Sequence, residues 1–153
     1  MRIIRRIGLV NNGGRFWIFD NENGGDINRN TGGWDVSKGG YTAHASISTS
    51  SITMYHKRDD APSHRRDASV TTKSYIDLTN IKTLKVYYGK TTGEWSSSDY
   101  GNVSFKLIDT SGNSKTLGSL SKYPGNYTIN FDVSSYKGKY KLKLSIGGDT
   151  NIS

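Results

Sequence analysis

The stretch SYIDLTNIKTLKVYYG, residues 74–89, decides the fold. A polar turn that begins at Asp77 delivers the chain into a strand in which apolar and polar side chains alternate. The apolar side of this strand carries Leu84, Val86 and Tyr88, and the other side carries Lys85 and Tyr87. Because successive side chains of a strand point to opposite faces, the strand must bury one face and leave the other in water.

The same arrangement recurs in FDVSSYKGKYKLKLSI, residues 131–146. Asp132 begins a second polar turn, and the strand after it again has an apolar and a basic side. The apolar side carries Tyr140, Leu142, Leu144 and Ile146, and the basic side carries Lys139, Lys141 and Lys143. Strands with one dry and one wet face are typical of antiparallel sheets, whereas parallel sheets are covered on both faces. The sequence therefore predicts an all-β protein built as an antiparallel β-sandwich.

Further strands are expected on both sides of these two stretches. They are residues 15–19, 41–48, 51–57, 68–72, 102–109, 115–117 and 127–133, separated by turn residues such as Gly, Asn, Ser and Asp. Residues 51–57 are expected to be the hairpin partner of residues 41–48, and residues 110–113 are expected to close a hairpin between residues 102–109 and 115–117. This makes roughly nine or ten strands at spacings of about ten residues, the cadence of a sandwich or jelly roll. We expect a single β-sandwich domain over residues 15–153.

The composition agrees with this class. The chain of 153 residues has 18 Gly and 10 Tyr but only 2 Pro, and it has no Cys. A domain of this length buries roughly two thirds of its unfolded surface without disulfides or metal. The lack of cysteine excludes thiol catalysis and zinc–thiolate sites, and it fits either a reducing compartment or an exported assembly that does not rely on oxidation.

Residues 1–14 are expected to form a basic N-terminal arm or an edge strand. The sequence MRIIRRIGLV places apolar residues on both sides of an extended chain, which indicates that a partner covers it. The residues expected to make this assembly contact are Arg2, Ile3, Ile4, Arg5, Arg6 and Ile7. The stretch has neither the uninterrupted apolar core nor the cleavage site of a signal peptide, and we expect no membrane partner.

The net charge of +8 favours polyanionic partners such as nucleic acid, anionic lipid or a phosphate-bearing wall polymer. A compact basic cluster in a charged loop is a candidate contact patch, formed by Arg58, His64, Arg65 and Arg66. Neighbouring aspartates partly neutralise it, so a solvated loop is the favoured interpretation. The aromatic and basic residues do not interleave as in a single-strand groove, and nucleic acid is therefore not the expected partner.

Three aromatic residues in or beside loops are candidates for glycan binding, because sugar rings dock their apolar faces on aromatic rings. They are Trp34, Trp95 and Tyr100. Trp95 is the strongest candidate, since a glycine and a run of serines flank it. For Trp34, a place in the core at the bottom of the sandwich is the favoured interpretation.

No catalytic or metal-binding motif is recognised. A polar loop with Asp20, Glu22, Asn23 and Asp26 has the oxygen atoms that could hold calcium. It lacks the spacing of a known calcium loop, so a polar turn is favoured. The histidines are too scattered for a metal triad; they are His44, His56 and His64. No serine elbow, framed carboxylate pair or phosphate-cradling glycine loop is present, so we expect neither a cofactor nor an enzyme.

The order of these features resembles a known group of modules. The sequence Gly32-Gly33-Trp34, then YIDLTNIKTLKVYY, a hairpin and FDVSSYKGKYKLKLSI resemble jelly-roll modules of bacteriophage tail, baseplate and fibre proteins. Those phages infect Gram-positive hosts, and their modules look like carbohydrate-binding sandwiches. The resemblance covers residues 15–146, and its characteristic parts are the two Asp-led turns with their strands. Such modules continue into a further strand; we expect either that the chain is trimmed or that the arm or a neighbouring subunit supplies the missing edge.

The resemblance implies a non-enzymatic virion structural protein of a tail, baseplate, fibre or capsid surface. We expect it to form a homo-oligomer, to contact other virion proteins and to touch host cell-wall polysaccharide. A free-standing carbohydrate-binding module and a polyanion- or nucleic-acid-binding protein are the alternatives.

Overall fold

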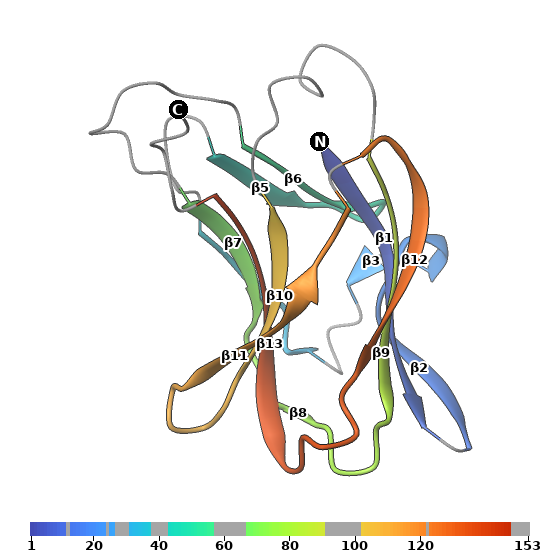
Figure 1. The fold of residues 1–153 in the computed structure, drawn as a ribbon, viewed down its shortest axis with the longest axis vertical. Helices are drawn as coiled ribbons and strands as arrows, with labels where there is room; N and C mark the ends of the chain where they lie inside the picture. Colours follow the sequence, from blue (N-terminus) through green and yellow to red (C-terminus); the bar gives the residue numbers. More distant parts are fainter. Residues whose placement is uncertain are drawn as a thin grey trace.

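The computed structural model describes residues 1–11, 13–23, 25–26, 31–37, 43–56, 67–90, 102–121 and 123–147. Two antiparallel sheets pack face to face as a β-sandwich (Figure 1). The predicted all-β sandwich is therefore confirmed.

The seven-stranded sheet, called sheet A, has the order β12-β9-β1-β2-β3, and β6 joins β1 to β5. Its strands are β1 (Arg2–Asn11), β2 (Gly14–Asp20), β3 (Gly25–Asp26), β5 (Ala43–Ile47), β6 (Ile52–His56), β9 (Thr83–Lys90) and β12 (Gly125–Asp132). A short 3-10 turn, η1 (Asn21–Asn23), lies between β2 and β3. The predicted hairpin of residues 41–57 is confirmed by the pairing of β5 with β6.

The six-stranded sheet, called sheet B, has the order β11-β10-β13-β7-β4, with β8 paired to β13. Its strands are β4 (Trp34–Ser37), β7 (Asp67–Thr72), β8 (Ile76–Asp77), β10 (Val103–Ile108), β11 (Ser114–Ser119) and β13 (Lys139–Gly147). The hairpin expected around residues 110–113 is confirmed as the β10–β11 turn. The strand β4 was not predicted, because four residues are too few to show an alternating pattern.

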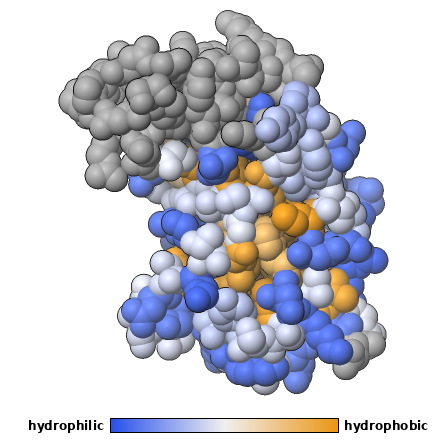
Figure 2. All heavy atoms as spheres, in the orientation of Figure 1, coloured by the Kyte–Doolittle hydropathy of each residue, from blue (hydrophilic) through white to orange (hydrophobic). Residues whose placement is uncertain are grey.

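The hydrophobic core lies between the two sheets and follows the alternation seen in the sequence. Leu84 and Val86 of sheet A and Leu142 and Leu144 of sheet B are each at most 1% exposed. Burial of one such side chain stabilises the fold by roughly 1.5–3 kcal/mol. Figure 2 shows hydrophobic residues gathered between the sheets, with hydrophilic residues around them.

The two Asp-led turns are crossovers that carry the chain from one sheet to the other. The first joins β8 of sheet B to β9 of sheet A, and the second joins β12 of sheet A to β13 of sheet B. In the first, Thr79 donates to Asp77 Oδ1 from its backbone N (2.9 Å) and its hydroxyl (2.6 Å). In the second, Ser134 donates to Asp132 Oδ1 in the same way at 2.9 and 2.6 Å.

The two crossovers are also hydrogen-bonded to each other through their backbones. The backbone N of Leu78 donates to Gly138 O at 2.8 Å, and the backbone N of Val133 donates to Lys82 O at 2.9 Å. The side chains of Leu78 and Val133 are 2% and 0% exposed, so each turn buries its second residue in the core. The repeated sequence pattern therefore corresponds to a repeated and interlocked structural unit that closes one end of the sandwich.

The prediction that residues 1–14 form an arm or an edge strand is wrong. Strand β1 lies inside sheet A, with β9 on one side and β2 and β6 on the other. Its register with β9 shifts between Ile4 and Arg6, and such a bulge puts two successive residues opposite one. The bulge lets Ile4, Ile7 and Leu9 all enter the core at 0% exposure, which explains why apolar residues do not keep one parity in the sequence.

No strand is missing beside the second Asp-led motif. Strand β13 is paired on both sides, by β10 and by β7. The expectation that the arm or a neighbouring subunit supplies an edge next to this strand is therefore wrong.

Candidate binding surfaces

The structure places Trp34 in the core. Trp34 is 8% exposed, begins β4 and lies opposite Thr72 of β7. A ring this deeply covered offers no face to a sugar, so Trp34 belongs to the core alternative and not to a glycan site. The other glycan candidates, Trp95 and Tyr100, lie outside the described residues, as do the four members of the basic patch: Arg58, His64, Arg65 and Arg66.

The residues expected to form an assembly arm divide between the core and the surface of sheet A. Ile4 and Ile7 are buried, and Ile3 is half-buried. Arg2 is also buried, and its Nε donates to Ser121 O at 3.4 Å. Arg5 and Arg6 are half-buried at the bulge.

Arg6 belongs to a cluster on the outer face of sheet A that the sequence did not reveal. Its guanidinium carbon lies 3.9 Å from the ring centroid of Trp17, and that of Arg15 lies 4.9 Å from the same ring. Arg15 also donates to the hydroxyl of Tyr87 at 3.2 Å. The two rings, Trp17 and Tyr87, have centroids 5.9 Å apart. Arg6, Arg15, Trp17 and Tyr87 are called the arginine–aromatic cluster below.

The cations of this cluster already have partners in the chain. Arg6 Nε lies 3.0 Å from Asp20 Oδ1, and Arg6 Nη2 lies 3.7 Å from Glu22 Oε2. Asp20 is fully buried and also accepts from the backbone N of Glu22 at 3.1 Å. Trp17 packs closely over Gly8, where an added Cβ would come within 3.0 Å of the ring. The cluster therefore stabilises β1, β2 and β9, and Asp20 serves an ion pair.

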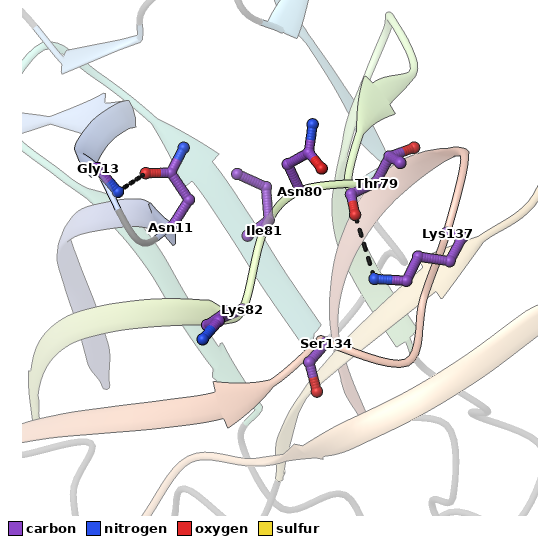
Figure 3. Close-up of a pocket in the computed structure, with 8 residues that line it drawn as sticks. All are labelled: Asn11, Gly13, Thr79, Asn80, Ile81, Lys82, Ser134 and Lys137. Atoms are coloured by element: carbon purple, nitrogen blue, oxygen red, sulfur yellow. Dashed lines mark hydrogen bonds between the residues drawn. The ribbon is translucent and has the colours of Figure 1, made fainter.

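A hollow of about 460 Å³ lies at the crossovers (Figure 3). Figure 3 shows that its residues come from the β1–β2 turn and from both crossovers; they are Asn11, Gly13, Thr79, Asn80, Ile81, Lys82, Ser134 and Lys137. Lys137 Nζ donates to Thr79 O at 3.2 Å, and Thr79 Oγ1 accepts from the backbone N of Gly138 at 3.1 Å. These groups serve the contact between the crossovers.

The carboxyl groups of the crossovers are stabilised in their charged form. Hydrogen bonds from the side chain and the backbone of Thr79 hold the pKa of Asp77 below its ordinary value, and Lys139 adds a smaller effect. The side chain and the backbone of Ser134 lower the pKa of Asp132 in the same way. Both aspartates therefore act as acceptors that fix their turns.

A second hollow, of about 200 Å³, lies on the outer face of sheet B. Each strand on the main path of this sheet contributes one serine to a row in register: Ser119, Ser104, Ser145, Ser69 and Ser37. The hollow is lined by Ser37, Ser69, Ser145, Lys106, Lys143 and Asp67, together with Ala68, Ile146 and Gly147. We call it the serine trough. The sequence shows these serines singly, and only the strand register brings them into one row.

Two general properties of the described residues bear on function. Among them, no group of three or more His, Cys, Asp or Glu side chains is placed to hold a metal ion. The described part of the chain also has no helix of the length and hydropathy needed to cross a membrane.

The comparisons with known proteins identify no relative: no protein-family model, no curated protein and no solved structure matches the chain. The fold is thus known from the strands themselves, as an all-β, two-sheet antiparallel sandwich.

Proposed function

We propose that this protein is a non-enzymatic structural and adhesive module of a bacteriophage particle, in a tail, baseplate, fibre or capsid-surface position. Copies of the module pack side by side in a symmetric assembly, and the assembly touches the cell-wall glycans of a Gram-positive host. The resemblance of the two Asp-led motifs to phage modules supports the setting. The observation that carries the assembly is the open edge of sheet A at β12.

Strand β12 is a long and regular edge. It pairs with β9 from Gly125 to Asp132 without a shift in register, and no described strand pairs with its other side. Its sequence, GNYTINFD, contains no proline and no lysine. Natural proteins block exposed edges with such residues, with bulges or with short strands, because an open edge pairs with other chains. An unblocked edge of eight residues supports strand pairing with a neighbouring copy.

The other terminal strands of the described sheets are less suited to pairing. Strands β3, β4 and β5 have two, four and five residues. Strand β11 carries Lys115, and the register of β10 with β11 shifts between Phe105 and Lys106. An assembly built through β12 therefore has one preferred contact, as a closed symmetric oligomer requires.

The assembly is tested by native mass spectrometry and light scattering of the full chain over a concentration series. We expect oligomers that the double variant Thr128→Lys/Asn130→Lys dissociates, because both residues lie on β12 and introduced lysines block an edge. The control, Thr110→Lys/Ser111→Lys, adds the same charge in the exposed β10–β11 turn and keeps the oligomers. A wild-type chain that remains monomeric at every concentration would overturn the assembly.

The assignment to a phage particle is tested separately. Proteomics of purified particles of a phage that encodes the chain is expected to find it in several copies per particle. Its absence from the particles would reject the virion assignment. A stable monomer that still binds purified cell-wall glycan would instead favour the alternative of a free-standing carbohydrate-binding module.

A further inference from the structure

We infer that the serine trough of sheet B is a binding site for a phosphate-bearing polymer of sugars or polyols. Lys106 and Lys143 contact the phosphate, and the serine hydroxyls contact the hydroxyl groups of the chain. This inference rests on the trough alone and does not depend on the proposed function.

The serine row makes a continuous floor. Ser104 lies opposite both Ser119 and Ser145, and Ser69 lies opposite both Ser145 and Ser37. With neighbouring strands roughly 4.8 Å apart, the row crosses about 19 Å of the sheet. Serine is small, and each hydroxyl both donates and accepts a hydrogen bond. The floor therefore leaves space for a ligand, and its hydroxyls can hydrogen-bond a ligand that carries hydroxyl groups along its length.

Ser69 is the most deeply placed hydroxyl of the trough. It is 9% exposed and lines the hollow at the centre of β7. Its hydroxyl makes no hydrogen bond within the described part of the chain, and it is open to solvent, because the buried polar atoms without a partner there do not include it. Ser69 therefore offers an unused donor and acceptor to whatever occupies the hollow.

The two lysines stand together on one bank of the trough. Lys106 of β10 and Lys143 of β13 are direct cross-strand neighbours. Like charges in this position destabilise a sheet. Neither lysine has a carboxylate within ion-pair distance among the described residues. A bound phosphate would supply the missing counter-charge to both.

The opposite bank has a different chemistry. Asp67 lines the hollow and lies opposite Gly147 in the register of β7 with β13. Its carboxylate repels a second phosphate and accepts hydrogen bonds from hydroxyl groups. The trough is therefore polarised across its width, with a place for a phosphate on the lysine side and one for a hydroxyl on the aspartate side.

The lining also discriminates between kinds of phosphate polymer. Single-stranded nucleic acids bind through bases that stack on aromatic rings. No described residue that lines the trough has a ring. The volume of about 200 Å³ is smaller than an ordinary ligand pocket of roughly 300–1,000 Å³, so it holds one unit of a chain that continues along the serine row.

The test is a titration of the ¹⁵N-labelled full chain followed by NMR. The probes are a short poly(glycerol phosphate), inorganic phosphate, neutral dextran and a single-stranded oligothymidylate. We expect poly(glycerol phosphate) to shift the amide signals of Ser69, Lys106 and Lys143, inorganic phosphate to shift the same signals more weakly, and dextran to shift none.

Two double variants separate the site from net charge. Lys106→Gln/Lys143→Gln is expected to weaken the binding of poly(glycerol phosphate) by about tenfold or more, because it removes both charge-assisted contacts. Lys82→Gln/Lys115→Gln removes the same charge from exposed lysines outside the trough and leaves the affinity within about twofold. Ser69→Ala keeps the lysines and is expected to weaken binding by several fold.

Each contrary result overturns the inference. Equal losses in the two double variants would show attraction by net charge, and shifts confined to other surfaces would place the site elsewhere. Tighter binding of the oligothymidylate at the trough would identify nucleic acid as the ligand. No shift with either phosphate probe would exclude the site. Thermal unfolding of each variant shows whether a loss of binding reflects a loss of folding.

Discussion

The cations on the outer faces of the two sheets differ in the side chains that surround them. On sheet A, Arg6 lies 3.9 Å from the ring centroid of Trp17 and 3.0 Å from a carboxylate oxygen of Asp20. On sheet B, Lys106 and Lys143 lie opposite each other beside a row of serines, without a carboxylate partner in the described chain. Of these three cations, Lys106 and Lys143 line a hollow, whereas Arg6 is held by a ring and a carboxylate.

The difference follows from the side chains. The planar guanidinium of arginine stacks on rings and forks onto carboxylates, whereas lysine carries a compact charge on a flexible stem. The arginine–aromatic cluster is therefore a set of internal contacts that ties β1, β2 and β9 together. A net charge of +8 favours polyanionic partners in general, but it does not distinguish the two faces.

The largest effect is expected from breaking the ion pair of sheet A. Asp20→Ala removes a fully buried carboxylate that contacts Arg6 and the backbone of Glu22. Arg6 is partly exposed and keeps Glu22 at 3.7 Å, so the loss is smaller than for a fully buried pair, and we expect destabilisation by about 2 kcal/mol. Chemical denaturation measures this effect. Asp20→Asn keeps the shape and should lose less; a change below about 0.5 kcal/mol for Asp20→Ala would contradict the structural role of the cluster.

A smaller effect is expected at the crossovers that join the two sheets. Asp77 and Asp132 have a pKa below their ordinary value of 3.8. A carboxyl group with a lowered folded pKa stabilises the fold above its unfolded pKa, and this stability disappears as the pH falls through the folded pKa. Thermal unfolding between pH 5 and pH 2 should therefore show stability falling below about pH 4.

The double variant Asp77→Asn/Asp132→Asn should flatten this pH dependence, because asparagine does not titrate. The control, Asp35→Asn, changes an exposed aspartate of β4 that has no such turn contact among the described residues. An identical pH profile in the double variant and the wild type would show that the crossover hydrogen bonds do not favour the charged carboxylates.

The smallest expected effect on the free energy of unfolding is a stabilisation, and it tests the contrast between the two faces. Lys106→Gln relieves a pair of like charges, so we expect it to stabilise the protein by a few tenths of a kcal/mol while it weakens phosphate binding. Denaturation at low ionic strength is the measurement, since salt screens the repulsion. Lys115→Gln on β11 should leave the stability unchanged. A loss of stability in Lys106→Gln would mean that this lysine, like Arg6, makes a structural contact.

Local sequence patterns predicted a large part of the fold. The alternation in residues 84–88 and 140–146 identified faces that are buried in the structure, and the polar turns at Asp77 and Asp132 were expected where the crossovers lie. The hairpins of β5 with β6 and of β10 with β11 were also expected. These features depend on neighbouring residues, because alternation, turn hydrogen bonds and short loops act over a few positions.

The candidate sites were much less accessible from the sequence. Trp34 was a candidate for both a glycan site and the core, and only its burial between the sheets decided between them. The guanidinium carbon of Arg6 lies 5.8 Å from the ring centroid of Tyr87, although the two residues are 81 positions apart in the chain. The sequence contains no marker for such a contact.

The sequence by itself determined the class of the protein, an antiparallel sandwich, and the positions of its two repeated turns. Only the tertiary structure decided that the N-terminal strand lies inside sheet A, that its bulge turns Arg6 toward Trp17, and that the serines of sheet B form one row. The physical reason is that a side chain's face follows from its own strand, whereas its neighbours follow from the register between strands that are distant in the chain.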